Sequence, residues 1–168
     1  MLANQIAAWI AEQVSAAGAQ GVVVGLSGGV DSSVVAVLAQ RAVGEHLLGL
    51  LMPCHSQPVD GEYARLLADT FSIETITVDL GPAYDALIAA LPPGSDLARA
   101  NLKPRLRMAT LYFVANTRNY LVAGTGNKSE IMVGYFTKWG DGGCDLLPLG
   151  GLFKTHVWDL ACELGIPE

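Results

Sequence analysis

The chain alternates short apolar runs with longer amphipathic stretches, and this alternation constrains its fold more than any other feature. The apolar runs read GVVVGL, HLLGLLM, IETITV and YLVAGT, and they predict strands over Gly21–Leu26, His46–Met52, Ile73–Val78 and Tyr120–Thr125. Runs of this length are typical of parallel strands that helices cover on both faces. The sequence therefore predicts an α/β fold, a doubly wound parallel sheet with helices on both faces.

Helical patterns separate and follow these runs. The first segment, MLANQIAAWIAEQV, predicts an amphipathic helix, since it lacks the basic flank and cleavage site of a signal peptide. Further helices are predicted over Asp31–Val43, Pro58–Phe71, Pro82–Leu91, from about Leu102 to Asn116, and from Lys154 to Gly165. In such a fold ligands bind beyond the carboxyl ends of the strands. We therefore expect one shared edge for the loops after Leu26, Met52, Val78 and Thr125.

The long helix after residue 100 is apolar over much of its circumference. Asn101 is a candidate N-cap, which would leave Pro104 in the first turn, where its missing N–H costs little. Two apolar stripes follow, one formed by Leu102, Leu106, Ala109 and Phe113 and one by Met108, Leu111, Tyr112 and Val114. Such a helix has neighbours on several sides. A homodimer interface and a large intramolecular core explain it equally well, and we expect the former.

Composition narrows the function classes. The 168 residues suit one domain spanning 1–168, with 51% hydrophobic and 15% charged residues, and no apolar run is long enough to cross a membrane. This apolar excess is a second indication of a subunit interface. The net charge of −6 argues against a surface that coats nucleic acid. Eight of the ten Lys and Arg residues follow residue 98, which indicates a local anion site.

The three cysteines form no C-x-x-C pair. This count and spacing disfavour a disulfide framework or a zinc site and indicate a reducing, cytoplasmic location. Cys54 and His55 follow the second predicted strand, so they are expected in a loop that lines a nucleoside pocket.

The segment GLSGGVDSS joins the first strand to the first internal helix. It matches neither G-x-G-x-x-G nor G-x-x-x-x-G-K-[ST], because Val30 and Asp31 follow Gly29. Its glycines allow phosphate oxygens to approach main-chain N–H groups, and the helix N-terminus adds positive potential. Asp31 would repel a bare phosphate, so its presence predicts a Mg²⁺ ion between the two. The alternative is a Gly/Ser turn in which Asp31 is an acid of the first helical turn, where the helix dipole stabilises its negative charge.

This loop resembles the pyrophosphate loop of the N-type ATP pyrophosphatases, whose fold is adenine nucleotide alpha hydrolase-like. The segments NLKPRLRM, GTGNKSE, GYFTKWGDGGCDLLPL and LFKTHVWDLACELGIPE resemble, more specifically, ammonia-dependent NAD synthetase. The resemblance implies a ligase that converts nicotinic acid adenine dinucleotide, ATP and ammonia into NAD, AMP and pyrophosphate. It also implies a homodimer with the dinucleotide at the subunit interface.

The resemblance assigns roles to individual residues. ATP contacts are implied for Gly25, Leu26, Ser27, Gly28, Gly29, Val30, Asp31, Ser32, Thr125 and Lys154, and contacts to the deamido-dinucleotide for Arg105, Lys138 and Asp145. Asp31 and Glu130 match the magnesium ligands, and Asp31, Lys138 and Lys154 are the expected catalytic residues. Each has a plain alternative as a cap, a helix-terminal charge or a surface residue. The loop WGDGGC is expected to close over a substrate, with Tyr135 and Trp139 stacking on a ring or packing the loop.

Family members continue beyond the point where this sequence stops, at GIPE. The family's further segment carries a threonine and a His–Lys pair that contact nucleotide, so the resemblance predicts a chain that lacks these contacts. The resemblance is to the form of the family without an appended glutaminase segment, so ammonia is expected free or from a partner. Two alternatives remain: another N-type ATP pyrophosphatase, such as a tRNA-thiolating enzyme or a GMP synthetase domain, and a non-catalytic nucleotide-binding dimer.

Overall fold

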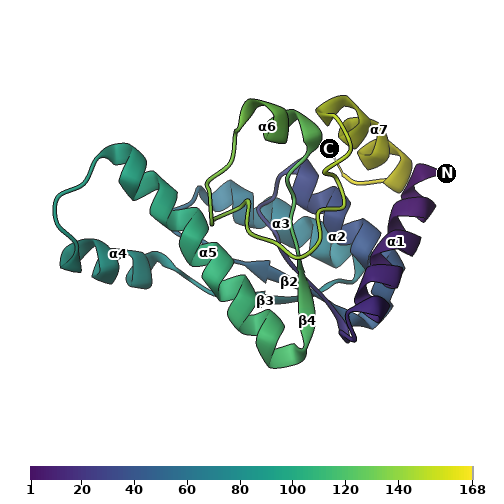
Figure 1. Ribbon diagram of the computed structural model, residues 1–168, viewed down its shortest axis with the longest axis horizontal. Coiled ribbons are helices and arrows are strands. Elements are labelled where there is room, and N and C mark those ends of the chain that lie inside the picture. The colour runs from purple at the N-terminus through teal and green to yellow at the C-terminus, as the bar shows by residue number, and fades with distance from the viewer. Residues whose placement is uncertain (168) are drawn as a thin grey trace.

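The computed structural model describes residues 1–167, and its centre is one four-stranded parallel sheet (Figure 1). The strands lie in the order β3-β2-β1-β4, and they span Gly21–Gly25 (β1), Leu47–Leu51 (β2), Glu74–Thr77 (β3) and Tyr120–Ala123 (β4). Every pair is parallel, with Val22 beside both Leu47 and Leu121. The predicted α/β fold and all four strands are confirmed, each strand shorter by one or two residues.

Eight helices connect and flank the strands in the described residues. They are α1 (Leu2–Ala16), α2 (Val30–Val43), the 3-10 helix η1 (Gly44–His46), α3 (Pro58–Phe71), α4 (Gly81–Ala90), α5 (Asp96–Arg118), α6 (Lys128–Val133) and α7 (Lys154–Leu164). Within residues 1–167, no helix combines the length and the apolar character needed to cross a membrane.

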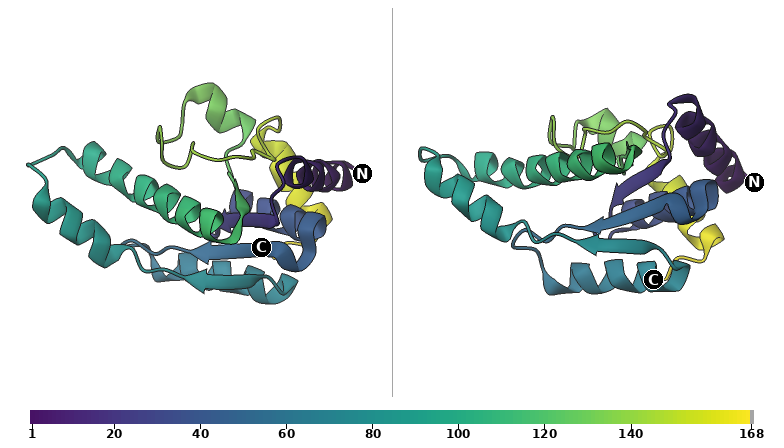
Figure 2. Two further views of the ribbon diagram at one scale, coloured as in Figure 1. Left: turned by 60° about the horizontal axis from the view of Figure 1, so that its bottom comes forward. Right: turned by 90° about the horizontal axis from the view of Figure 1, so that it is seen from below.

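Alternating side chains of β1 supply both halves of the core. Val22 and Val24 join a cluster with α1, α2, α3 and α7, whereas Val23 points to the other face, where α5 lies. All three valines are fully buried. The two layers of helices are visible from below (Figure 2). A strand flanked on both faces needs the continuous apolar run that this sequence has.

One strand departs from this prediction. All four residues of β3 are exposed, so the expectation that every strand is covered on both faces is wrong for this strand. β3 is an edge strand with β2 as its neighbour, and the chain leaves it through α4, which extends away from the body (Figures 1 and 2). The charged and hydroxyl residues of β3 suit this exposure.

The start of α5 also differs from the prediction. The helix begins at Asp96, and its cap is Ser95, whose Oγ accepts a hydrogen bond from the Ala98 N–H at 3.2 Å. The Asn101 cap is therefore wrong, and Pro104 lies inside the helix. Its missing N–H leaves the exposed carbonyl of Ala100 without a helical partner, which water can replace.

Helix α6 was missed because it has six residues. Its sequence signal is the N-K-S-E pattern, a capping box in which Asn127 and Glu130 exchange hydrogen bonds between side chain and main chain. The pattern was available in the sequence, but so short a helix has no apolar periodicity.

Candidate active site

The carboxyl ends of all four strands border one large cavity. This cavity, of about 590 Å³, is lined at the strand ends by Gly25, Leu51, Thr77 and Ala123. Its remaining walls come from the start of α3, from α5 and from the loop at residues 140–143. The predicted sharing of one edge by the four loops is confirmed, and the loop expected to cover a substrate borders the same space.

The glycine-rich loop shapes one side of the cavity. Gly28 has φ +82°, and a Cβ there would collide with the carbonyl oxygen of Asp60, so only glycine fits. Gly29 is the N-cap of α2, and its carbonyl accepts hydrogen bonds from the Oγ atoms of Ser32 and Ser33 at 2.8 and 3.0 Å. Ser27 Oγ lies 3.0 Å from Ser32 Oγ. The hydroxyls thus hold the turn in shape without a ligand.

A second cavity, of about 420 Å³, adjoins the first and shares Ser27, Thr125 and Asp141 with it. Both predicted metal ligands, Asp31 and Glu130, line this second cavity. It is also lined by Gly29, Ser32 and Gly126. The structure therefore brings the predicted ATP residues from β1, α2 and β4 together with the two carboxylates.

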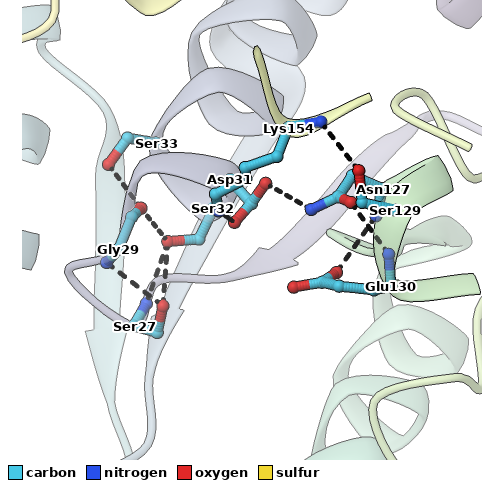
Figure 3. A network of polar contacts seen from close by, with 9 residues as sticks. All are labelled: Ser27, Gly29, Asp31, Ser32, Ser33, Asn127, Ser129, Glu130 and Lys154. Atoms are coloured by element: carbon cyan, nitrogen blue, oxygen red, sulfur yellow. Dashed lines mark hydrogen bonds and ion pairs between the residues drawn. The ribbon is translucent and has the colours of Figure 1, made fainter. Parts of the chain in front are cut away.

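Lys154 meets Asp31 across this site, as Figure 3 shows. Its Nζ forms an ion pair with Asp31 Oδ2, and the two side chains are 39% and 17% exposed. Lys154 is therefore not the solvated first-turn lysine of the alternative interpretation. The pair also answers the electrostatic problem of the loop, since the lysine neutralises the acid that stands beside the expected phosphate position.

The two carboxylate oxygens of Glu130 differ in their contacts. One carboxylate oxygen, Oε2, accepts a hydrogen bond from the Asn127 N–H at 3.1 Å and caps α6. The other oxygen is turned away from Asn127 (Figure 3) and has no hydrogen-bond partner among the residues that the structure describes. Within residues 1–167 no three acidic, His or Cys side chains cluster as a ready metal site. Asp31 and Glu130 are therefore the two carboxylates beside the glycine-rich loop that could bind an ion, and Asp141 also lines this cavity.

Two of the three residues predicted to contact the dinucleotide, Arg105 and Lys138, are in direct contact. Arg105 donates from Nε to the carbonyl of Lys138 at 3.2 Å, and Lys138 Nζ lies 5.5 Å from the centre of the Trp139 ring. Neither Arg105 nor Lys138 lines either cavity. Both side chains instead belong to exposed residues beside them.

Asp145 is engaged by the fold. Its carboxylate accepts hydrogen bonds from the Val122 N–H at 2.8 Å and from the Tyr112 hydroxyl at 2.9 Å. Desolvation by burial raises the pKa of Tyr112 above its ordinary value, and the bond to Asp145 raises it further. This carboxylate therefore joins α5 to the outer edge of β4.

Other expectations about loop residues are corrected. Neither Cys54 nor His55 lines the large cavity, because Cys54 is buried below it and His55 bonds Asp85 at 2.8 Å. Tyr135 and Trp139 are 77% and 69% exposed, so neither packs its loop.

Two residues were missed. Arg107 lines the large cavity and donates to the Met52 carbonyl at 3.1 Å and to Ser56 Oγ at 3.2 Å, bridging α5 to the loop after β2. Asn127 lies completely buried between Asp31 and Glu130. The N-K-S-E pattern could have indicated Asn127, whereas no local signal distinguishes Arg107 from the other arginines of α5.

The domain is a parallel α/β fold with a glycine-rich loop between β1 and α2 and two adjoining cavities at the carboxyl edge of the sheet. This combination is typical of nucleotide-binding proteins. The family model for NAD synthase matches residues 2–168. The chain therefore belongs to the NAD synthase family, as its motifs predicted, and the other ATP pyrophosphatases are not favoured.

Individual relatives agree. The NH(3)-dependent NAD(+) synthetase of Carboxydothermus hydrogenoformans is 53% identical over 165 residues, covering 95% of this chain and 68% of that protein. The solved NH3-dependent NAD synthetase of Campylobacter jejuni, in complex with the nitrate ion, superposes with a TM-score of 0.94 at 36% identity, covering 98% of this chain and 72% of that one. NMN synthetase from Francisella tularensis gives 0.95 at 37% identity, with 99% and 70% covered.

Proposed function

We propose that this chain forms NAD from nicotinic acid adenine dinucleotide, ATP and ammonia, releasing AMP and pyrophosphate. The observation that carries the proposal is the convergence of Asp31, Glu130 and the loop serines on one cavity that opens into a larger one. ATP fits this pair of cavities if its phosphates lie along the loop and its adenosine occupies the larger space.

The reaction is written as two displacements. An oxygen of the nicotinate carboxylate bonds to the α-phosphorus of ATP, and the bond to the β-phosphate oxygen breaks as pyrophosphate leaves. Ammonia then attacks the carbonyl carbon of the acyl-adenylate, AMP departs with the bonding electron pair, and a proton is released to give the amide. No protein nucleophile is needed, so catalysis rests on positioning and on charge neutralisation.

The chain's residues supply both contributions. The N-terminus of α2 and its loop bind the phosphates, and Thr125 is placed to contact ATP because it borders both cavities. Lys154 pairs with Asp31, which lines the second cavity, so its positive charge can stabilise the departing pyrophosphate there. Arg107, with its forked donors, forms a wall of the adenosine space.

Mg²⁺ fits the donor set of the second cavity. Asp31 and Glu130 offer hard carboxylate oxygens, and one oxygen of Glu130 is not used by the described residues. One or two carboxylates completed by phosphate oxygens and water are the usual magnesium ligands. When bound, the ion supplies additional positive charge for the leaving diphosphate.

The dinucleotide is proposed to extend beyond the cavities towards Arg105 and Lys138, whose exposed positions leave them accessible. Asp145 is a weaker candidate, since its carboxylate already accepts two hydrogen bonds. Large apolar side chains exposed to solvent, including Phe113 at 73% and Tyr135 at 77%, support a homodimer. A cytoplasmic location is proposed because all three cysteines are free thiols.

The decisive experiment mixes the protein with ATP, MgCl₂, ammonium and nicotinic acid adenine dinucleotide, and follows NAD and AMP together. Equal release of the two products supports the proposal. ATP binding without AMP release would favour the non-catalytic dimer. Nicotinic acid mononucleotide in a parallel reaction tests whether the chain instead prefers the shorter substrate, as a relative of NMN synthetase could.

Asp31→Asn tests the metal assignment separately. The amide keeps the size of the side chain but removes the charge that attracts a cation. Nucleotide binding should lose its dependence on Mg²⁺, and unchanged dependence would remove Asp31 from the metal site. Sedimentation of wild type and Phe113→Glu tests the homodimer, because a buried carboxylate at the interface would shift the species to the monomer.

A further inference from the structure

Asn127 is one of three completely or almost completely buried polar residues among those described, and it is fully inaccessible to solvent. Its side-chain Oδ1 accepts from the Glu130 N–H at 3.1 Å, and its Nδ2 donates to Asp31 Oδ1 at 3.0 Å. Its main-chain N–H donates to Glu130 Oε2 at 3.1 Å. This one residue therefore contacts both predicted metal ligands, Asp31 and Glu130.

Capping of α6 does not require an asparagine. A serine or aspartate oxygen would accept the Glu130 N–H equally well. The contact with Asp31 has a different requirement, because a carboxylate accepts hydrogen bonds and needs a donor opposite it. Asparagine combines the capping oxygen with an N–H donor, and its amide carries no charge into the site.

The contact also joins distant parts of the chain. Asp31 lies at the start of α2 and Asn127 at the start of α6, 96 residues later. Asp31 receives Lys154 on its other oxygen, so its carboxylate is held from two sides (Figure 3). If the Asn127 amide were removed, Lys154 would be the remaining side chain that fixes the rotamer of Asp31.

We infer that Asn127 is a positioning residue that orients Asp31 and Glu130 towards the cavity so that both can bind one Mg²⁺ ion with ATP. This inference rests on the proposed function, because it assumes that the two carboxylates are the metal ligands. Groups that orient metal ligands in this way typically change metal affinity by about 10- to 100-fold when they are replaced.

Asn127→Ser and Asn127→Asp separate capping from positioning. Both replacements keep an oxygen at the cap, and neither keeps the N–H that Asp31 accepts. The serine variant should bind α,β-methylene-ATP about 10- to 100-fold more weakly in the presence of Mg²⁺, with affinity in EDTA unchanged. In turnover, the Mg²⁺ concentration for half-maximal rate should rise by a similar factor, while kcat at saturating Mg²⁺ changes less. The aspartate variant should lose at least as much, because it places a like charge opposite Asp31.

Asn119→Gly is the matched control. Asn119 ends α5 with φ +55°, which glycine adopts readily, and the change removes one Nδ2 hydrogen bond, to the Gly18 carbonyl at 3.0 Å. It should leave nucleotide and Mg²⁺ affinity unchanged. Thermal unfolding of each variant shows whether the fold is retained.

The outcomes are distinguishable. Wild-type affinity for the magnesium-bound analogue in Asn127→Ser would overturn the positioning role while leaving the proposed function intact. Equal weakening with and without Mg²⁺ would also overturn it, since that result indicates general damage. If the wild type itself binds the analogue without Mg²⁺ dependence, both the metal assignment and the role of Asn127 fail.

Discussion

Two regions of this molecule hold their charged side chains in different ways. At the site, Asp31 pairs with Lys154 and Asn127 in a partly buried network. In the arm, which we define as residues 81–105, the ion pair of Asp85 with His55 has side chains that are 62% and 50% exposed. Leu97, also in the arm, is 70% exposed to solvent. The chain thus holds the charged groups of its phosphate side in partly buried contacts, whereas the ion pair of the arm is exposed to solvent.

The largest effect is expected where the site network is broken. Lys154→Met keeps much of the side-chain volume but removes the charge opposite Asp31. NAD formation should fall by about 100-fold or more, because an electrostatic contact that stabilises the transition state is lost. Steady-state rates of NAD release measure this loss.

Lys103→Met is the matched control in the arm. Lys103 Nζ lies 5.4 Å from the centre of the Tyr84 ring and lines neither cavity. Its loss should change the rate by less than about threefold. Similar losses in both variants would contradict the distinction between the two regions.

Matched leucines compare the packing of the two regions. Leu38 on α2 is fully buried, and Leu38→Ala should lower the free energy of unfolding by about 2–5 kcal/mol. Leu97→Ala in the arm should cost about 0.5 kcal/mol or less, because its side chain is exposed. Urea unfolding measures both. A cost above about 1 kcal/mol for Leu97, especially one that grows with protein concentration, would show that the arm packs against a second copy.

The same distinction explains what the sequence could predict. The valines of β1 and the glycines and serines of the loop carry local signals, apolar continuity and turn chemistry, so the sheet and the phosphate side of the site were predictable. The start of α5 was not, because Ser95 and Asn101 are both acceptable caps and only tertiary structure decides between them. The exposure of β3 depends on which elements pack against that edge of the sheet, since β4 at the opposite edge is partly buried, and the spacing of runs does not encode this.

Long-range polar contacts were the least predictable. Lys154 with Asp31 and Arg107 with the Met52 carbonyl join residues far apart in sequence. Their types alone allow a surface role, and the resemblance assigned Lys154 but not Arg107. Asp145 shows the opposite case, since the fold uses the carboxylate that the resemblance had assigned to substrate.

Tyr112→Phe tests the contact between α5 and Asp145. The change removes the hydrogen bond to Asp145 and should cost about 1 kcal/mol near neutral pH. The folded-state pKa of Tyr112 is raised, so the stability linked to its protonated form is present below the unfolded value near 10 and is lost as pH rises above it. Unfolding at pH 8 to 11 should therefore show a decline in wild type that is smaller in Tyr112→Phe. Parallel curves would contradict this role of the hydroxyl.

The smallest effect is expected for the ion pair of the arm. Both partners are at least half exposed, so water and salt screen their attraction and side-chain ordering offsets part of it. Asp85→Asn should change the free energy of unfolding by about 0.5 kcal/mol or less. His55 has φ +53°, a conformation that asparagine tolerates, so His55→Asn is a suitable second variant for a double-mutant cycle. The coupling energy should be small at pH 6 and should disappear in high salt. A coupling energy that persists in high salt would mean that the pair of Asp85 and His55 is shielded from water, as the pair of Asp31 and Lys154 is in part.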